Sequence, residues 1–453
     1  MKIPLYPYQQ KGVDFLYQLG SGILGDEPGL GKSAQALALC EKVQAEKVLI
    51  FCPAVLKWQW AQEIEKFLPG NKSVVIEGTK GERDALWEKK DARFYIANYE
   101  LLLRDFEEME KTAWSIIIAD EATKISNPKA KQSRAIKALR ARRRIAMTGT
   151  PINNKAQDIW NLADFCIPGS LGNYWAFLAR YCIKNEWNAI VGHKNLVDLN
   201  YRLKRIMIRR LKEEVLPELP EKVVIDIPFE FSPKEKELYQ KIKKEILGEI
   251  TKTDIDKMEN PQNLALFAMV KMIRLRQLAD SMELLGQNEK SSKMEVLKEL
   301  LSEQNGKKVL VFSEFSEMCK ILHRDLAEYH PLMIIGETSA QERQEVLKKF
   351  NEDETHRVCI LSSAGQFGLN LQASSVIIHY DQAWSISKME QREGRAHRIG
   401  QKESVMVYNL LAKGSADMHV RKVLKNKAAL SDEVLAGPQL TIADIQYMLN
   451  KYE

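Results

Sequence analysis

A glycine-rich segment near the amino terminus has the residue types of a phosphate-binding loop. Residues Asp26–Ser33 read DEPGLGKS and lie directly before a predicted helix, Lys32–Val43. In such a loop the backbone N–H groups turn inward around phosphates, the lysine contacts the β- and γ-phosphates, and the hydroxyl residue contacts Mg²⁺. Gly29 and Gly31 permit the tight backbone approach. Asp26 stands where the standard pattern has glycine, so a turn that only caps the helix is the alternative for this segment.

Two neighbouring carboxylates end a predicted buried strand. Ser115–Glu121 is largely apolar up to Asp120 and Glu121. In phosphate-loop NTPases an acidic residue at such a strand end holds Mg²⁺, and an adjacent glutamate can polarise the attacking water. An acidic strand end alone is common in proteins. Combined with the loop, the pair predicts nucleotide hydrolysis, with Lys32, Asp120 and Glu121 as catalytic residues and with Ser33 and Asp120 as metal ligands.

A third group of residues capable of this chemistry lies near the carboxyl terminus. Residues Gln391–Gln401 read QREGRAHRIGQ, and Arg395 and Arg398 are three positions apart, so they would share one side of a helix. Arginines from a second domain can stabilise the charge on a phosphoryl group during its transfer. An exposed basic helix is the alternative. We therefore predict that Gln391, Arg395 and Arg398 complete the catalytic set.

These groups need a scaffold, and the apolar pattern predicts one. Short β-branched runs alternate with helical patterns in two blocks of the chain, which is typical of parallel α/β sheets. The predicted strands are Lys47–Pro53, Arg93–Tyr99, Ser115–Glu121 and Arg144–Gly149 in the first block, and Lys308–Ser313, Leu332–Ile335, Arg357–Ser362, Val376–Tyr380 and Val405–Leu410 in the second. Between the blocks, Lys155–Lys222 and Pro233–Leu285 are predicted to be helical.

Composition limits the class of protein. The chain has 453 residues, of which 45% are hydrophobic and 28% charged, as in a soluble globular protein with two or more domains. No apolar run approaches the about 18 residues of a membrane span, and the first residues, MKIPLYPYQQ, lack the apolar core of a signal peptide. The six cysteines are scattered and the seven histidines lack ligand spacing, so mostly buried, reduced thiols are expected rather than disulfides or zinc ligands.

The chain carries a net charge of +6, and part of that charge is concentrated in one run. Lys129–Arg144 holds eight basic residues and no acidic one. Such a run can bind a polyanion, although many charge runs are simply solvated helix faces. The charge pattern alone leaves both interpretations open.

The motifs, taken in order, resemble those of superfamily-two helicases, and specifically of the Swi/Snf-type ATPases. In the first block the resemblance rests on Leu5–Gly12, Asp26–Ser33, Cys52–Glu63, Ala97–Glu100, Asp120–Thr123, Thr148–Asn154 and Ile208–Pro220. In the second block it rests on Val311–Phe315, Gly336–Arg343, Leu361–Leu371, Asp381–Trp384 and Gln391–Gln401. The family's form of the phosphate loop has DE-x-GLGK, which accounts for Asp26. The ordered set covers nearly the whole chain, about residues 3–415.

The resemblance implies a fold and a set of site residues. The fold would be two RecA-like parallel-sheet lobes with helical protrusions: an ATP-binding lobe, residues 1–228, with a protrusion at about 155–222, and a helicase lobe, residues 229–453, with a helical segment at about 233–285. ATP and Mg²⁺ would be the cofactors. The implied nucleotide-binding residues are Gln9, which would contact adenine, and Asp26, Gly29, Leu30, Gly31, Lys32, Ser33, Gly368 and Asn370. The implied coupling residues are Thr148, Gly149 and Thr150, and the implied DNA contacts are Trp58, Asn98, Thr338, Ser339, Arg343, Ser362 and Trp384.

The sequence departs from the family pattern at three places. Thr123 replaces the usual histidine of DEAH, Ser385-Ile386 replace an Asn-Pro pair, and Gln366-Phe367 replace Gly-Leu. These changes should leave the ATP chemistry intact and affect details that face DNA. The chain has no room for chromatin-reading, zinc or nuclease modules, so a bare motor of prokaryotic or phage origin is expected.

The implied function is an ATP-dependent double-stranded DNA translocase or remodeller. A monomer is expected, in the cytoplasm or, for a eukaryotic source, in the nucleus, and a DNA-bound protein could be its displaced partner. Catalysis would need closure of the lobes, promoted by DNA. Two alternatives stay open, namely a strand-separating helicase and a nucleotide-gated clamp without turnover. Single-strand motors stack bases on aromatic side chains, for which Trp58, Trp60 and Trp384 are candidates, although packing roles fit these residues equally well.

Overall fold

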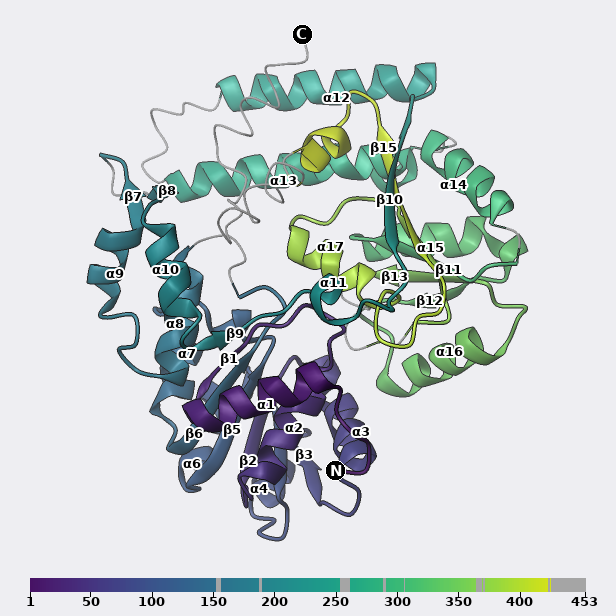
Figure 1. Ribbon diagram of the computed structural model, residues 1–453. Coiled ribbons are helices and arrows are strands. Elements are labelled where there is room, and N and C mark those ends of the chain that lie inside the picture. Colours follow the sequence, from purple (N-terminus) through teal and green to yellow (C-terminus); the bar gives the residue numbers. More distant parts are fainter. Residues whose placement is uncertain are drawn as a thin grey trace. The chain divides into compact units, whose positions relative to one another are not determined.

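The computed structural model describes residues 1–151, 156–186, 190–252, 261–287, 291–304, 306–363, 369, 371–422 and 424. The described chain forms two compact units that divide between Leu219 and Pro220. Each unit has its own parallel β-sheet covered by helices (Figure 1). The predicted α/β class with two parallel-sheet lobes is therefore confirmed.

The described part of unit 1 is organised around a sheet with the strand order β3-β4-β2-β5-β6-β1-β9, and its strands are all parallel. Their bounds are β1 Gly22–Leu24, β2 Val48–Cys52, β3 Ser73–Val75, β4 Phe94–Asn98, β5 Trp114–Asp120, β6 Ala141–Met147 and β9 Met207–Ile208. Strands β2, β4, β5 and β6 correspond to the predicted ones. Strands β1, β3 and β9 have two or three residues, which is too short for a periodic signal.

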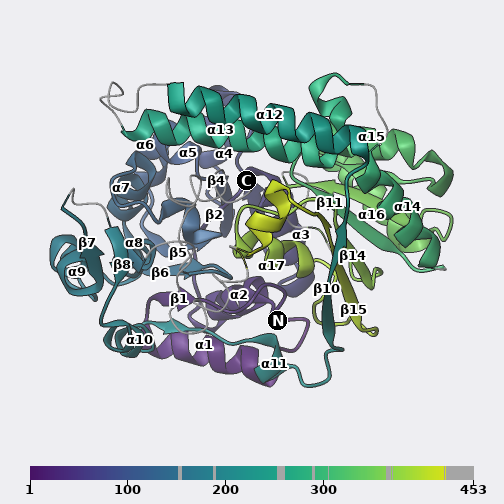
Figure 2. The same ribbon diagram turned by 90° about the horizontal axis from the view of Figure 1, so that it is seen from above.

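Helices cover both faces of this sheet. Their bounds are α1 Pro7–Leu19, α2 Lys32–Lys42, α3 Lys57–Phe67, α4 Lys80–Trp87, α5 Leu101–Arg104, α6 Phe106–Glu110, α7 Lys131–Ala138, α8 Ala156–Cys166, α9 Tyr174–Tyr181, α10 Leu196–Leu203 and α11 Lys212–Val215, with short 3-10 turns at Ala54–Leu56 and Ala122–Ile125. Sheet residues such as Phe51 and Ile117 pack in one cluster with side chains of α4 to α8. Their sequence neighbours Ile50 and Ile116 belong to the opposite face of the sheet and are also fully buried. Helices α1, α2 and α3 pack side by side on this opposite face (Figure 2). Burial on both faces explains the almost continuous apolar strands.

The segment predicted to be a helical protrusion is mainly helical but contains further strands. It contains the helices α8, α9 and α10, and between α9 and α10 lies an antiparallel pair, β7 Cys182–Lys184 with β8 Ile190–His193. The chain then returns to the main sheet as β9, which pairs with β1. This return brings the segment that follows β9 beside the phosphate loop.

The described part of unit 2 has a sheet with the order β10-β15-β14-β11-β13-β12, again all parallel. Its strands are β10 Lys222–Phe229, β11 Val309–Ser313, β12 Leu332–Ile334, β13 Val358–Ser362, β14 Val376–His379 and β15 Val405–Ala412. Its helices are α12 Pro233–Lys252, α13 Pro261–Asp280, α14 Ser292–Glu303, α15 Ser316–Asp325, α16 Ala340–Glu352 and α17 Ile386–Glu393, with 3-10 turns at Met282–Leu285 and Ala327–Tyr329. Helices α14 and α15 pack on one sheet face, whereas α16 packs on the other.

The boundary between the units falls earlier than the expected division after Pro228. Strand β10 pairs with β15 along its whole length, from Lys222 with Val405 to Phe229 with Ala412. It therefore belongs to unit 2. Its half-buried residues and the Pro228 near its end do not give the continuous apolar run by which the other strands of this sheet are predicted.

Two expectations from composition can be compared with the structure. All six cysteines are buried and unpaired, as predicted. Among the residues that the structure describes, none of the helices combines the length and the apolar character that a membrane crossing requires.

Candidate active site

The phosphate loop joins β1 to α2 and adopts the backbone that its glycines permit. Gly29 has φ 94° and Gly31 has φ 72°, both in the left-handed region that disfavours side chains. A Cβ atom on Gly31 would lie 2.4 Å from Nε2 of Gln9. Helix α2 begins at the next residue, Lys32, so its amino end faces the loop. This geometry is that of an anion-binding turn and not only of a helix cap.

Lys32 reaches back over the loop. Its Nζ donates to the carbonyl oxygen of Asp26 at 2.7 Å and to that of Glu27 at 3.4 Å. Burial lowers the pKa of Lys32, and the negative charges of Glu121, Asp26 and Asp120 act against that shift. The lysine is thus electrostatically linked to both carboxylates that the sequence assigns to catalysis.

Asp120 lies at the carboxyl end of β5 and is held by several donors. Trp60 Nε1 donates to Oδ2 at 3.0 Å, and the backbone N–H of Glu121 donates to Oδ1 at 2.9 Å. The hydroxyl of Tyr99 donates to the carbonyl oxygen of Asp120 at 2.7 Å. These bonds orient the carboxylate at the sheet edge. Trp60 is 2% exposed, so it supports the acidic residue and does not present a surface for bases.

Glu121 has an unusual backbone conformation. Its φ is 48° and its ψ is 51°, which is left-handed and costs about 1 kcal/mol or more for a residue with a side chain. Such strain is common where a catalytic side chain must be directed out of a strand end. The strain therefore supports the predicted role of Glu121.

The buried side chains of Gln9 and Asp26 both bond to other groups of unit 1. Gln9 is 4% exposed, its Nε2 donates to the carbonyl oxygen of Leu30 at 3.1 Å, and its Oε1 accepts from the N–H of Tyr6 at 3.0 Å. Asp26 is fully buried, and Arg210 Nε donates to its Oδ1 at 2.9 Å. Both side chains thus fix the loop, and contact of Gln9 with adenine stays a prediction.

The predicted coupling residues lie against the phosphate loop. Thr148 follows β6, and its Oγ1 accepts from the N–H of Thr150 at 3.1 Å. A Cβ atom on Gly149 would lie 2.7 Å from Cγ of Pro28, so this glycine allows close packing against the loop. Asn153 and Asn154 lie outside the described residues. Phosphate loop, acidic pair and coupling residues therefore meet at one edge of the unit 1 sheet.

In unit 2 the two predicted catalytic arginines lie beyond the end of a helix and not on one. Helix α17 ends at Glu393, and both Arg395 and Arg398 follow in turns, so a shared helix face does not apply to them. Gln391 lies within α17 and is mostly buried. The predicted nucleotide contacts Gly368 and Asn370 lie outside the described residues.

Arg392 is a structural residue that the sequence did not single out. It is fully buried, and its Nη2 donates to Glu314 at 2.6 Å while its Nη1 donates to the carbonyl oxygen of Asp381 at 3.2 Å. Burial would raise the pKa of Glu314, but the positive charges of Arg392 and Lys388 hold it below its usual value. This network ties the turns that carry Arg395 and Arg398 to the end of β11.

The residues predicted to contact DNA are divided between exposed and packed positions. Trp58 on α3 is 50% exposed. Asn98 donates to Glu100 at 2.5 Å at the end of β4. Ser362 is fully buried in β13, and Trp384 is partly buried against Arg276, whose guanidinium lies 4.2 Å from the ring centre.

The remaining predicted contacts form a tight turn before α16. Thr338 Oγ1 accepts from the N–H of Ile335 at 3.0 Å, and Ser339 caps the helix by accepting from the N–H of Glu342. Arg343 is mostly buried and donates to the carbonyl oxygens of Thr338 and Ile335. In this arrangement Arg343 shapes the turn, and Thr338 and Ser339 remain the candidates for contact.

The fold places the basic residues of the run Lys129–Arg144 in different surroundings. Lys129, Lys131, Arg134, Arg140 and Arg142 are exposed. Lys137 binds Asp164, and Arg143 donates to carbonyl oxygens of α1 and of Gly20. Arg140 and Arg142 lie at the amino end of β6, away from the edge that carries Asp120. The run therefore does not form one continuous surface.

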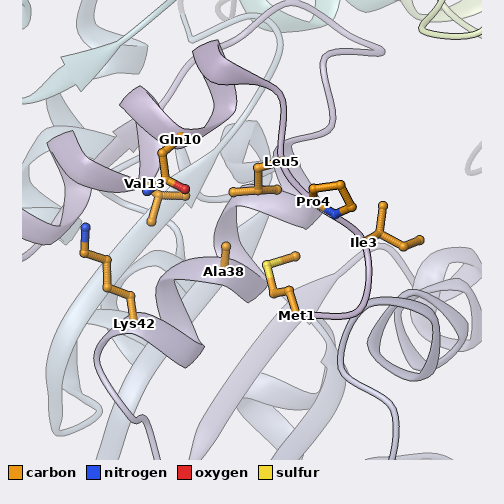
Figure 3. A pocket seen from close by; sticks show the side chains of 8 residues that line it. All are labelled: Met1, Ile3, Pro4, Leu5, Gln10, Val13, Ala38 and Lys42. Carbon is orange, nitrogen blue, oxygen red and sulfur yellow. The ribbon is translucent and has the colours of Figure 1, made fainter.

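A cavity of about 280 Å³ lies beside α1 and α2 (Figure 3). Its lining is mostly apolar and consists of Met1, Ile3, Pro4, Leu5, Gln10, Val13, Ala38 and Lys42. The polar ends of Gln10 and Lys42 both bond to Asp14. Neither Lys32 nor Gln9 lines it, so it is separate from the phosphate loop.

Comparison with known families agrees with this geometry. Residues 8–284 match the family model of the SNF2-related domain, and residues 292–400 match that of the helicase conserved C-terminal domain. The chain belongs to the SNF2-related family. The resemblance seen in the motifs is therefore confirmed, and the SNF2-related domain contains the phosphate loop, the acidic pair and the coupling residues.

Several known proteins are similar to this SNF2-related chain. MG018 of Mycoplasma genitalium, named an uncharacterized ATP-dependent helicase, is 30% identical over 448 residues, which are 95% of this chain and 42% of that protein. YwqA of Bacillus subtilis, named an ATP-dependent helicase/translocase, is 30% identical over 456 residues, covering 95% of this chain and 49% of YwqA. The chain thus spans about half the length, or less, of these relatives. A solved SWI2/SNF2 ATPase core of Sulfolobus solfataricus in complex with dsDNA aligns with 99% of this chain and 95% of its own, at 28% identity and a TM-score of 0.47.

Proposed function

We propose that this SNF2-related chain is an ATP-driven motor that moves along double-stranded DNA. The observation that carries the proposal is the meeting of Lys32, Asp120, Glu121 and Thr148 at one edge of the unit 1 sheet. A phosphate-binding lysine, a metal-binding carboxylate, a water-polarising carboxylate and a coupling segment are the parts that ATP hydrolysis needs.

The chain's own groups divide the chemistry of ATP hydrolysis between them. Lys32 exchanges its bonds to loop carbonyls for bonds to the β- and γ-phosphates, and the loop N–H groups bind the remaining oxygens. Glu121, directed outward by its strained backbone, accepts a hydrogen bond from the attacking water and polarises it. Arg395 and Arg398 supply the positive charge that the transferring phosphoryl group needs.

The residues present fit a magnesium ion. Both carboxylate oxygens of Asp120 are oriented by N–H donors, and Ser33 lies in the first turn of α2. Oxygen ligands of this kind suit Mg²⁺. When bound, the ion would be held by Asp120 and Ser33 and would help to neutralise the charge that develops on the phosphates.

The positions of the three tryptophans that the sequence offers as stacking candidates support duplex DNA as the track. A single-strand motor needs exposed rings on which bases stack. Of the three tryptophans considered, Trp60 is buried against Asp120 and Trp384 is packed on Arg276, which leaves Trp58 exposed. Contact with phosphates through exposed Lys and Arg is then the simpler mode, and it would be nearly independent of base sequence. The name of YwqA as a helicase/translocase also supports movement along nucleic acid.

The test is a phosphate-release assay on the purified full chain with Mg·ATP, without nucleic acid and with duplex DNA. We expect low basal turnover and strong stimulation by the duplex. ATP and DNA binding without turnover would instead identify a nucleotide-gated clamp. Strand unwinding would identify a helicase, the activity named for MG018.

A further inference from the structure

The segment after β9 runs beside the phosphate loop, residue against residue. The N–H of Gly25 donates to the carbonyl oxygen of Ile208 at 2.8 Å, and the N–H of Glu27 donates to that of Arg210 at 3.1 Å. These bonds continue the parallel pairing of β1 with β9 beyond the ends of both strands. The backbone of the loop entrance is therefore fixed by a segment that is distant in sequence.

Two basic residues of this segment form ion pairs with the two acidic residues at the start of the loop. Arg210 forms a buried, two-point ion pair with Asp26, in which Nε donates to Oδ1 at 2.9 Å and Nη2 donates to Oδ2. Lys212 donates its backbone N–H to Oε2 of Glu27 at 2.7 Å, and its Nζ lies 3.9 Å from Oε1. Asp26, which distinguishes this loop from the standard pattern, and its neighbour Glu27 are thus each paired with a basic residue of this segment.

Arg210 also reaches the first helix. Its Nη1 donates to the carbonyl oxygen of Tyr8, and its Nη2 donates to Oε1 of Gln35 at 2.8 Å. One guanidinium therefore connects the start of α1, the loop and α2. A single ammonium nitrogen could not reproduce this set, because the three guanidinium nitrogens together serve both carboxylate oxygens of Asp26 and also Tyr8 and Gln35.

Arg209 makes a second, separate link. Its Nη1 donates to the carbonyl oxygen of Gly25 at 3.0 Å and to that of Gly149 at 2.8 Å. Gly149 in turn packs against Pro28 so closely that a Cβ atom would not fit. A single nitrogen therefore joins the entrance of the phosphate loop to the coupling segment.

We propose that Arg209 and Arg210 are positioning residues for ATP hydrolysis, a proposal that rests on the proposed function. Arg210 neutralises Asp26 so that this carboxylate does not compete with phosphate for Lys32. Arg209 sets the distance between the phosphate loop and Gly149, so that a change at one is transmitted to the other. Neither arginine is proposed to contact the reacting atoms.

The Arg210 part is tested by three variants of the full chain: R210K, D26N and the double variant D26N/R210M. KM for ATP, kcat with duplex DNA, affinity for a fluorescent ATP analogue and Tm are measured. We expect R210K to weaken nucleotide affinity and raise KM about tenfold or more, because an ammonium group does not form the two-point pair with the Asp26 carboxylate that the guanidinium forms. The double variant should recover most of the affinity because it removes both charges. Affinity in the double variant as weak as in R210K, or unchanged affinity in R210K, would overturn this part.

The Arg209 part is tested by R209M, R209K and the control R143M. Arg143 is a suitable control because its Nη1 also donates to carbonyl oxygens, those of Tyr17 and Gly20, at the opposite end of the unit 1 sheet. We expect R209M to lower DNA-stimulated kcat about tenfold or more while KM for ATP changes little. R209K should restore most of kcat, since one ammonium can bridge both carbonyls. R143M should lower Tm and leave both kinetic constants unchanged.

The outcomes separate this inference from the proposed function. If wild-type chain shows no DNA-stimulated ATP hydrolysis, the proposed function is wrong, while the affinity comparison of R210K with D26N/R210M still tests the charge pair. If wild type is stimulated and R209M keeps its kcat, or R209M and R143M lose kcat equally, the positioning role of Arg209 is wrong.

Discussion

The indole N–H of Trp60 donates to the carboxylate of Asp120 at 3.0 Å, while the ring itself is 2% exposed. A tryptophan that sequence reasoning considered as a stacking platform is thus a support for the carboxylate assigned to Mg²⁺. A hydrogen-bond donor that holds a metal-binding carboxylate in this way orients the carboxylate and tunes its affinity for the metal. The contact connects α3, whose Trp58 is exposed, to the strand end that carries the acidic pair.

Substitution of Trp60 by phenylalanine should weaken magnesium dependence without unfolding the protein. Phe keeps most of the packing volume and removes the N–H, so the Mg²⁺ concentration for half-maximal ATP hydrolysis should rise about tenfold. The matched control is W114F, which removes another buried indole donor, the one that binds the carbonyl oxygen of Met109 at 2.9 Å. Equal effects of W60F and W114F on magnesium dependence would contradict the assignment.

Variants of the phosphate site should separate binding from turnover. Lys32→Ala removes a positive charge from the phosphates and not from an apolar core, so hydrolysis should be abolished while the Tm changes little. Glu121→Gln should retain ATP affinity and lose turnover, because water is no longer polarised. Nucleotide affinity and single-turnover hydrolysis, measured on both purified variants, check this. Near-wild-type turnover in the two proteins would exclude the site as assigned.

The arginines of unit 2 should affect turnover more than affinity. If Arg395 and Arg398 stabilise the transferring phosphoryl group, replacement of either by alanine should cost ~10³-fold in kcat. Affinity for ATP should fall much less, since Lys32 and the loop remain. Steady-state kinetics of the full chain with saturating duplex DNA measure both quantities. A large loss of affinity with unchanged kcat would assign these arginines to ground-state binding instead.

The stability of the protein should depend on pH through His379. Burial lowers the pKa of His379 from an ordinary value of 6.5 to about 4, with Glu393 acting to raise it and the charges of Arg392 and Arg421 acting to lower it. Between these values the unfolded chain binds a proton that the folded chain does not, so stability falls as pH decreases from 6.5 to 4. The loss attributable to His379 is about 3 kcal/mol at most.

This pH dependence is measured by thermal unfolding of wild type and of His379→Gln between pH 4 and pH 8. The variant should show a shallower loss of Tm in the acidic half of that range. His323→Gln, at an exposed position on α15, is the control and should follow wild type. Parallel curves for wild type and His379→Gln would show that other groups dominate.

Much of the fold was accessible to sequence reasoning because buried parallel strands are short apolar runs. The prediction of Lys47–Pro53 differs from β2, Val48–Cys52, by one residue at each end. Strand β10 escaped prediction because its half-buried residues do not form such a run, and β9 because it has two residues. The position of β9 beside β1 is decided by tertiary pairing, which the local sequence pattern does not show.

The residues of the candidate site likewise divide into those with a local sequence signature and those that tertiary contacts bring beside them. Spacing and residue type predicted Lys32 and Asp120, because each stands at a tight turn or a strand end with a local signature, and the family resemblance implied Thr148. The partners that hold them were not predicted. Arg210 is 184 positions from Asp26, and nothing in either local pattern states that they meet. The helix argument for Arg395 and Arg398 was wrong because α17 ends at Glu393.

The activity proposed for this chain is movement along duplex DNA without strand separation. The most direct measurement compares ATP hydrolysis by the full chain with equal nucleotide concentrations of duplex DNA, single-stranded DNA and RNA, beside triplex-displacement and strand-unwinding assays under the same conditions. We predict stimulation by the duplex that weakens steeply with salt, ATP-dependent displacement of the third strand, and no unwinding. Efficient unwinding, or stimulation by single strands or RNA but not by the duplex, would contradict the proposed movement along duplex DNA.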